Sequence, residues 1–299
     1  MFIKNNMDIL IVGAGSIGVY LGTLLNTKDH NVFLLGRKKL KKLHETILID
    51  ERVYDIPKKI YSFPKNKSYD FIFITSKLYD LEKNLKKIVE NNLKTKYLLS
   101  IQNGIVQNEV YEKFTNKFNF SSISVFEGFR IIENQLVVNQ SKTGWKTDKS
   151  EAGIETSKLL KAAGINCSTK QNLESIKAEK TIMNCCVNIL SAIKKKTFFE
   201  LYRDPTTKKI MGDLFDESYL ILSKEYDLRS KEELRQLFYK TIKSMKHYSS
   251  TYQDAILNKK TEVRFLNGLI LKLAKKYKLQ TPTNKHILEK FRSKYPKSN

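Results

Sequence analysis

The sequence predicts an α/β fold in which a doubly wound parallel sheet is followed by an all-helical region. Three observations predict it. A short apolar run at 7–12 leads directly into a glycine-rich segment, strand-like runs then alternate with helical patterns up to about residue 170, and only helical patterns follow Asn172. Since 299 residues exceed the usual ~100–200 of one domain, we predict two domains, at 1–170 and 171–299.

The glycine-rich segment at 13–18 reads GAGSIG and has the spacing GxGxxG directly after the first predicted strand. In this context the first glycine allows a tight turn, the second lets the backbone approach a pyrophosphate, and the third allows close packing of helix on strand. The N-terminus of the following helix then offers free N–H groups to the phosphates. The pattern predicts a Rossmann dinucleotide site with the cofactor-binding residues Gly13, Gly15, Ser16, Ile17 and Gly18.

The end of the second predicted strand bears on the choice of cofactor. An NAD site usually has an acidic residue there, which binds the ribose 2′-hydroxyl. Here the strand at 31–35 is followed by Gly36 and Arg37. A guanidinium at this place can receive a 2′-phosphate, so the sequence favours NADP(H), although a solvated basic turn is the alternative reading.

Polar residues follow two further predicted strands, where ligands bind in open parallel sheets. The run at 70–74 is followed by Thr75, Ser76 and Lys77, and the run at 96–101 by Gln102, Asn103 and Gly104. Later strands are predicted at 121–126, 129–132 and 135–139, the last two as a possible hairpin.

The helical half is predicted to contain helices at about 173–194, 206–226, 231–245 and 262–276, and a last one beginning at Pro282. Thr261 is predicted to cap the helix that has Glu262 in its first turn. The Lys-rich tail after Phe291 is expected to be loosely held.

One stripe of the first long helix is unusual. Lys180, Asn184 and Asn188 recur four residues apart and therefore share a face, although the apolar residues around them predict a buried helix. A solvated lysine is the simpler reading of Lys180 alone. Two asparagines on the same stripe favour a binding role, because Asn is a poor residue for a helix interior.

Composition limits the classes of function. The formal charge of +23 is spread over the chain, and only eight of the 54 basic residues are arginine, so we expect weak attraction of polyanions and no specific nucleic-acid partner. Three cysteines without metal-ligand spacing favour a reducing, cytoplasmic location and no metal site. No long apolar run predicts a membrane span, and the uncharged stretch at 9–27 lacks the cleavage pattern of a signal peptide.

Taken together, these motifs resemble the ketopantoate reductase family (2-dehydropantoate 2-reductase) over nearly the whole chain. The similarity is carried by GAGSIG at 13–18, Ser76-Lys77, QNG at 102–104, KTIMNCCVN at 180–188, SSTYQD at 249–254 and TEVRFLNG at 261–268. The resemblance implies a Rossmann domain, an all-helical second domain, and NADPH-dependent reduction of 2-dehydropantoate to (R)-pantoate in pantothenate and coenzyme A biosynthesis.

The resemblance also implies roles for individual residues. The catalytic residues would be Lys180, the general acid, and Glu262, which would orient Lys180 and hold a substrate hydroxyl. Asn184, Asn188 and Ser250 would bind the substrate, and Asn103 would lie between nicotinamide and substrate. The phosphate-bearing end of the cofactor would be served by Arg37 and Lys77, and Asn103 and Glu262 also count among the cofactor-binding residues.

Alternatives remain open at this stage. A relative that reduces another 2-oxo acid or ketone would carry the same residues, and a noncatalytic NADP-binding protein would keep the fold. The expected partner is a small 2-oxo acid, with no specific nucleic acid, no membrane and no metal, and the protein is expected to be a monomer or a homodimer.

Overall fold

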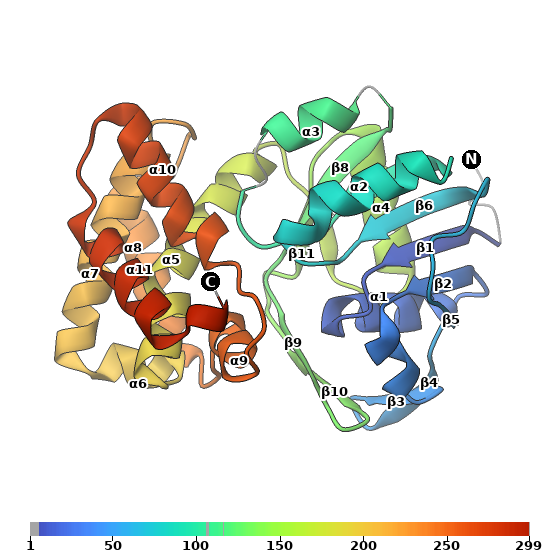
Figure 1. Cartoon of the computed structure of the whole chain (residues 1–299), viewed down its shortest axis with the longest axis horizontal. Coiled ribbons are helices and arrows are strands. Elements are labelled where there is room, and N and C mark those ends of the chain that lie inside the picture. The colour runs from blue at the N-terminus through green and yellow to red at the C-terminus, as the bar shows by residue number, and fades with distance from the viewer. Residues whose placement is uncertain (1–5, 106–107, 116, 299) are drawn as a thin grey trace. The chain divides into compact units, whose positions relative to one another are not determined.

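In the computed structural model, which describes residues 6–105, 108–115 and 117–298, the chain divides into two compact units, Met1–Leu173 and Glu174–Asn299. Figure 1 shows the first in blue to green and the second in yellow to red.

The first unit is built on a mostly parallel sheet. Within the described residues this sheet has eight strands in the order β12-β11-β8-β7-β6-β1-β2-β5, and only β11 runs antiparallel to its neighbour β8. The strands are β1 Asp8–Val12, β2 Asn31–Leu35, β5 Lys58–Ile60, β6 Ser68–Ile74, β7 Lys94–Ser100, β8 Phe120–Val125, β11 Trp145–Thr147 and β12 Cys167–Thr169.

The direction of the chain across the sheet reverses at β1. β2 pairs with β1 on one side and β6 pairs with it on the other, both in parallel. Because strand-helix-strand crossovers are right-handed, the helices of the two directions cover opposite faces of the sheet. The point of reversal lies between β1 and β6, and such points are where open α/β sheets bind ligands.

The helices of this unit are α1 Ser16–Asn26, α2 Leu81–Glu90, α3 Asn108–Thr115 and α4 Glu151–Ala162. Alternate residues of the central strands, including Ile9, Ile11 and Phe73, pack with buried residues of α1 and α4 into one hydrophobic cluster around Trp145, which is fully buried. Since both faces are covered, the central strands are apolar along most of their length.

A second, smaller sheet has the order β4-β3-β10-β9, with β3 Thr46–Ile49, β4 Arg52–Asp55, β9 Gly128–Ile132 and β10 Gln135–Asn139. β9 and β10 form the expected antiparallel hairpin, and β10 pairs in parallel with β3. The sequence did not predict β3, β4, β5, β11 or β12.

The second unit is helical throughout its described residues. Its helices are α5 Leu173–Lys194, α6 Phe198–Arg203, α7 Pro205–Leu222, α8 Lys231–Ser244, α9 Ser250–Ile256, α10 Asn267–Tyr277 and α11 Pro282–Lys294, with short 3-10 turns η3 at Val263–Phe265 and η4 at Pro296–Ser298. Capping boxes begin α6 at Thr197 and α8 at Ser230, so local sequence fixes these two helix starts.

α5 supplies much of the core of this unit. Ile182, Cys185, Cys186, Ile189 and Leu190 are fully buried, as the apolar pattern of the helix predicts. The chain around α5 belongs to α7, α8, α10 and α11 (Figure 1). Both cysteines are packing residues, and burial raises the pKa of each thiol, which keeps them neutral.

The prediction that the tail after Phe291 is loosely held is wrong for the residues that the structure describes. The backbone N–H of Thr261 and its hydroxyl both donate to the carbonyl of Ser298, at 2.9 and 2.7 Å, and Ser298 is buried. The end of the chain is therefore bound to the segment that contains Glu262.

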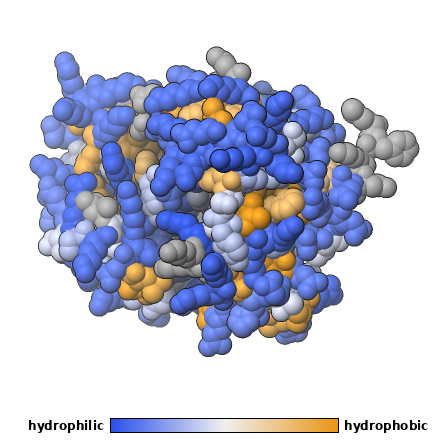
Figure 2. Space-filling view, turned by 45° about the vertical axis from the view of Figure 1, so that its right-hand side comes forward, coloured by the Kyte–Doolittle hydropathy of each residue, from blue (hydrophilic) through white to orange (hydrophobic). Residues whose placement is uncertain are grey.

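The face shown in Figure 2 is predominantly hydrophilic, and apolar residues form scattered patches on it. Among the residues that the structure describes, no helix is long and apolar enough to cross a membrane.

Candidate active site

The glycine loop of the first unit is crowded at two glycines and open at the third. Gly13 has a φ of +128°, and a Cβ there would lie 2.6 Å from the backbone nitrogen of Ser76. A Cβ on Gly18 would lie 1.9 Å from the carbonyl oxygen of Gly13. At Gly15, in contrast, a Cβ would meet nothing within 4 Å. The loop therefore needs glycine at 13 and 18 for its own fold, and at 15 it leaves open space.

The open space lies at the N-terminus of α1. Gly15 is the N-cap residue, and the first intrahelical bond runs from the Val19 N–H to its carbonyl at 2.9 Å. The N–H groups of Ser16, Ile17 and Gly18 precede that bond and have no partner inside the helix by helix geometry. A phosphate fits such a place, because the N–H groups and the positive end of the helix dipole both attract it.

The end of β6 is tied to the glycine loop. The hydroxyl of Thr75 donates to the carbonyl of Gly13 at 2.7 Å, and its backbone N–H donates to Val12 at 3.0 Å. The next residues are Ser76, whose hydroxyl accepts from Asn84 at 2.8 Å, and Lys77, which is partly buried at the start of the 3-10 turn η2, Leu78–Asp80.

The end of β7 joins the same edge. The amide of Gln102 donates to the carbonyls of Ile74 at 2.8 Å and Ser76 at 3.2 Å, which fixes the loop that carries Asn103 against the end of β6. Asn103 is partly buried. Arg37, after β2, has a side chain that is 88% exposed. The cofactor residues predicted in the first unit thus share the carboxyl edge of one sheet, whereas Glu262, also predicted to contact the cofactor, belongs to the second unit.

In the second unit, Lys180 and Glu262 interact across 82 positions of sequence. Burial lowers the pKa of the Lys180 amine to about 8. The charge of Glu262 acts in the opposite direction and raises it, while the charge of Lys177 lowers it further. Glu262 itself is only 5% exposed. Lys180 is partly buried, and burial has the largest effect on the pKa of its amine, which argues against the solvated-lysine reading.

The structure also corrects the local context of Glu262. The predicted helix from 262 does not begin there, since a 3-10 turn at Val263–Phe265 comes first and α10 begins at Asn267. Thr261 is not a cap, because its hydroxyl donates to Ser298. Glu262 thus lies on a short connecting segment whose position depends on contacts with the rest of the unit.

The amide stripe of α5 meets the start of α9. Asn188 is buried and Asn184 partly buried, and the carbonyl of Asn188 accepts from the Ser249 hydroxyl at 2.9 Å. The backbone N–H of Ser249 donates to Ser191 at 3.2 Å. The start of α9, whose first residue is Ser250, is therefore bound to α5 at Asn188 and Ser191.

Sequence reasoning missed the role of Asn267. This residue is fully buried, and its amide donates to the carbonyl of Cys185 at 3.0 Å and to the side chain of Asn284 at 2.9 Å. Asn284 in turn donates to the carboxylate of Glu217 at 2.8 Å. Asn267 follows Glu262 by five positions and Cys185 follows Lys180 by five, so this bond ties together the two segments that carry the candidate catalytic pair.

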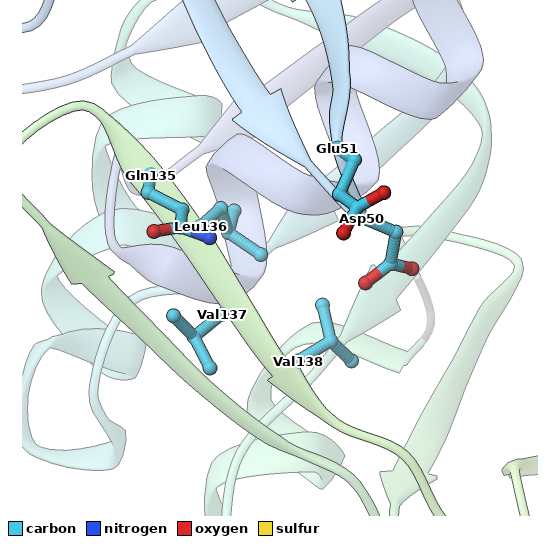
Figure 3. Close-up of a pocket in the computed structure, with 6 residues that line it drawn as sticks. All are labelled: Asp50, Glu51, Gln135, Leu136, Val137 and Val138. Carbon is cyan, nitrogen blue, oxygen red and sulfur yellow. The ribbon is translucent and has the colours of Figure 1, made fainter.

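A surface hollow on the small sheet lies apart from these residues within the first unit. It is lined by Asp50 and Glu51, from the turn between β3 and β4, and by four consecutive residues of β10, Gln135, Leu136, Val137 and Val138 (Figure 3). None of the predicted site residues lines it, so we assign the site from the strand ends and from α5. Among the described residues, no group of His, Cys, Asp and Glu is arranged to hold a metal ion.

Fold and loop together define the class: a Rossmann-fold protein with an all-helical second unit. Sequence comparison gives the family. The profile of ketopantoate reductase PanE/ApbA matches residues 9–147, and that of its C-terminal part, ketopantoate reductase PanE/ApbA C terminal, matches 172–294. The chain belongs to the ketopantoate reductase PanE/ApbA family.

Individual relatives are distant but match along their whole length. The 2-dehydropantoate 2-reductase of Aquifex aeolicus is 26% identical, covering 96% of this chain and 97% of the relative, and that of Pyrococcus horikoshii is also 26% identical, covering 93% and 94%. Among solved structures, a PanE/ApbA family ketopantoate reductase from Ralstonia eutropha has a TM-score of 0.85 at 20% identity, covering 97% of this chain and 98% of that one. D-mandelate dehydrogenase with NADH and anilino(oxo)acetate has a TM-score of 0.85 at 22% identity, covering 96% and 98%.

Proposed function

We propose that the protein reduces 2-dehydropantoate to (R)-pantoate with NADPH, a step of pantothenate and coenzyme A biosynthesis. The observation that carries the proposal is the Lys180 amine, whose pKa of about 8 is set by burial and by Glu262, in a chain of this family. An amine with that pKa is still mostly protonated at pH 7 and can release its proton to a stronger base, as a general acid must.

The first unit fits a phosphorylated dinucleotide. Its glycine loop leaves space at Gly15 beside the first N–H groups of α1, and the exposed guanidinium of Arg37 is proposed to receive a 2′-phosphate. Lys77, which follows β6, is proposed to serve the same end of the cofactor. When bound, the reduced nicotinamide supplies the hydride. Asn103, after β7, is proposed to contact both nicotinamide and substrate.

The second unit supplies the acid and the groups that hold the substrate. Lys180 donates a proton to the ketone oxygen as negative charge develops there, and its ammonium stabilises that charge. Glu262 keeps Lys180 charged and oriented through its own buried carboxylate. Asn184, Asn188 and Ser250 are proposed to bind the hydroxyl and carboxylate of the substrate through hydrogen bonds.

Turnover with a panel of 2-oxo acids tests the proposal. NADPH oxidation is followed by absorbance with 2-dehydropantoate and with other branched and aromatic 2-oxo acids. We expect the highest kcat/KM for 2-dehydropantoate. If another acid is reduced with a clearly higher kcat/KM and 2-dehydropantoate is not turned over, the substrate assignment is wrong.

A second candidate is a reductase of a different 2-oxo acid. The specific observation is that D-mandelate dehydrogenase, solved with NADH and anilino(oxo)acetate, matches the fold with a TM-score of 0.85. Thr251 and Tyr252 directly follow Ser250 in α9, so their side chains are candidates for shaping the proposed substrate site. The aromatic 2-oxo acids in the panel distinguish the two candidates.

Replacing Lys180 separates a reductase from a noncatalytic NADP-binding protein. For Lys180→Met we expect kcat to fall by about 10²–10⁴-fold, the usual contribution of a general acid, with the Kd for NADPH unchanged. Lys194→Met, at an exposed lysine of the same helix, is the control and should keep full activity. Unchanged turnover in Lys180→Met would contradict the role of this residue.

A further inference from the structure

Opposite charges stand on either side of the glycine loop. Arg37 follows the end of β2, and Asp80 ends the turn η2 after β6. Because β1 lies between β2 and β6 in the sheet, Arg37 and Asp80 flank the loop that begins at Gly13. Their side chains meet, with 3.8 Å between Nη2 of Arg37 and Oδ2 of Asp80.

The carboxylate of Asp80 is not used by its own helix. Asp80 is the N-cap residue of α2, a position where Asp ordinarily accepts a hydrogen bond from the first turn. Within the described part of the chain its side chain makes no such capping bond. The Asp80 side chain is 28% exposed and that of Arg37 is 88% exposed, so the carboxylate is the more enclosed partner. Its charge is directed at Arg37 instead of at the helix N-terminus.

We infer that Asp80 sets how strongly the site prefers NADPH over NADH, because it competes with the 2′-phosphate for Arg37. The inference rests on the proposed function for the identity of the cofactor. A guanidinium paired with a carboxylate offers less net attraction to a phosphate, and the same carboxylate repels the phosphate charge. A ribose 2′-hydroxyl is neutral and can donate to a carboxylate, as it does in NAD sites.

Asp80 is therefore a specificity-determining residue that weakens the preference created by Arg37 and leaves NADH usable. The sequence pattern after β2 predicts the attraction of Arg37 for the 2′-phosphate. The competing effect comes from Asp80, which lies 43 positions later in the sequence. Only the strand order brings it next to Arg37.

Direct binding of the two dinucleotides to the full chain tests this inference without turnover. Dissociation constants for NADPH and NADH are measured by calorimetry for the wild type and Asp80→Asn. Glu82→Gln is the matched control, since it removes one negative charge from the same segment, where Glu82 pairs with Lys86 at 3.1 Å and Lys113 at 3.7 Å.

We expect the ratio Kd(NADH)/Kd(NADPH) to rise about two- to five-fold in Asp80→Asn, the range of an exposed ion pair. In Glu82→Gln the ratio should not change. The rise should shrink as ionic strength increases from roughly 0.05 M to roughly 0.5 M, because salt screens exposed charges. An unchanged or lower ratio in Asp80→Asn overturns the inference, and so does an equal rise in Glu82→Gln.

The variant Arg37→Gln distinguishes failure of the inference about Asp80 from failure of the proposed function. In the Arg37→Gln background, Asp80→Asn should raise the ratio less than it does in the wild type, because the competition needs the guanidinium. If Arg37→Gln loses the preference for NADPH but Asp80→Asn has no effect, the inference fails and the proposed function stands. If the wild type binds neither dinucleotide, both fail.

Discussion

At the scale of single residues, the amine of Lys180 combines two opposing influences. Burial lowers its pKa from 10.5 to about 8, and without Glu262 the pKa would be lower still. A lysine whose pKa is lower in the folded than in the unfolded protein lowers folding stability. The reason is that the unfolded chain binds the proton more tightly than the folded one. Folding stability attributable to Lys180 is thus lowest below pH 8 and recovers as pH rises towards 10.5. Residues retained at such a cost are characteristic of functional sites.

The pH profile of the reaction follows from this pKa. A general acid must be protonated, so kcat/KM should fall as pH rises through about 8 in the wild type. In Glu262→Gln the carboxylate that raises the pKa of Lys180 is gone, so the fall should move to lower pH. The measurement is kcat/KM from pH 6 to about 10 for both proteins. A fall at the same pH in both would show that Glu262 does not act on the acid.

At the scale of secondary-structure elements, the six-residue glycine loop contains one glycine needed for its own fold, Gly18, and one that leaves space for a ligand, Gly15. A methyl group at Gly15 meets open space, whereas at Gly18 it collides with the carbonyl of Gly13. Substitution at the two positions should therefore have different consequences although the chemical change is the same.

We expect Gly15→Ala to fold normally and to bind NADPH at least about ten-fold more weakly, because the methyl group occupies the space for the pyrophosphate. Gly18→Ala should lower the free energy of unfolding instead, since the loop must move to relieve the contact. Thermal unfolding and NADPH titration of both variants check this. Wild-type affinity in Gly15→Ala would mean that the pyrophosphate lies elsewhere.

The Asn267 bond joins the segment of Glu262 to α5, so its loss should affect chemistry as well as stability. Asn267→Ala should lower the free energy of unfolding by about 2–4 kcal/mol. It should also reduce kcat/KM and change the pH at which kcat/KM falls. Tyr295→Phe is the matched control, since it removes only the hydroxyl bond to the Ala192 carbonyl of the same helix, 2.8 Å long, and leaves the Asn267–Cys185 bond and the backbone bond from Ser298 to Tyr295 in place.

Both proteins are assayed well below their melting temperatures. For Tyr295→Phe we expect a loss of about 1 kcal/mol in stability and an unaltered pH profile. An identical profile for Asn267→Ala and the wild type would reduce Asn267 to a structural residue.

At the scale of the whole molecule, the large positive charge acts on every anionic ligand. The proposed substrate and cofactor are both anions, and a net charge of +23 raises their local concentration. We expect kcat/KM to fall several-fold between roughly 0.05 M and roughly 0.5 M NaCl while kcat changes little, because salt screens attraction before binding. A kcat/KM independent of salt would indicate that the charge has no part in capture.

The fold followed from sequence where local signals were strong. β1, β2 and α5 lie where apolar runs and periodicity placed them. The hairpin of β3 and β4 was missed for a physical reason. Its turn residues, Asp50 and Glu51, have φ values of +45° and +65°, yet neither is the Gly or Asn that usually marks such turns. The short helices α6 and α9 carry too few residues for a periodic pattern.

The candidate site was predictable only where its residues are close together in the sequence. Helical spacing alone places Lys180, Asn184 and Asn188 on one face. The partnership of Lys180 with Glu262 spans most of the helical unit, so spacing could not predict it and only the family resemblance suggested it. Long-range contacts such as those of Asn267 and Asp80 leave no local pattern in a single sequence.

The bond between Thr261 and Ser298 has a practical consequence for work on this protein. Thr261 immediately precedes Glu262, so a change next to Ser298 would act on the segment that carries the carboxylate proposed to tune the acid. We therefore expect an affinity tag placed next to Ser298 to disturb the property under measurement. Asp8, the first residue of β1, lies at the amino edge of the sheet and opposite the glycine loop, so a tag placed before β1 is the better choice for kinetic experiments.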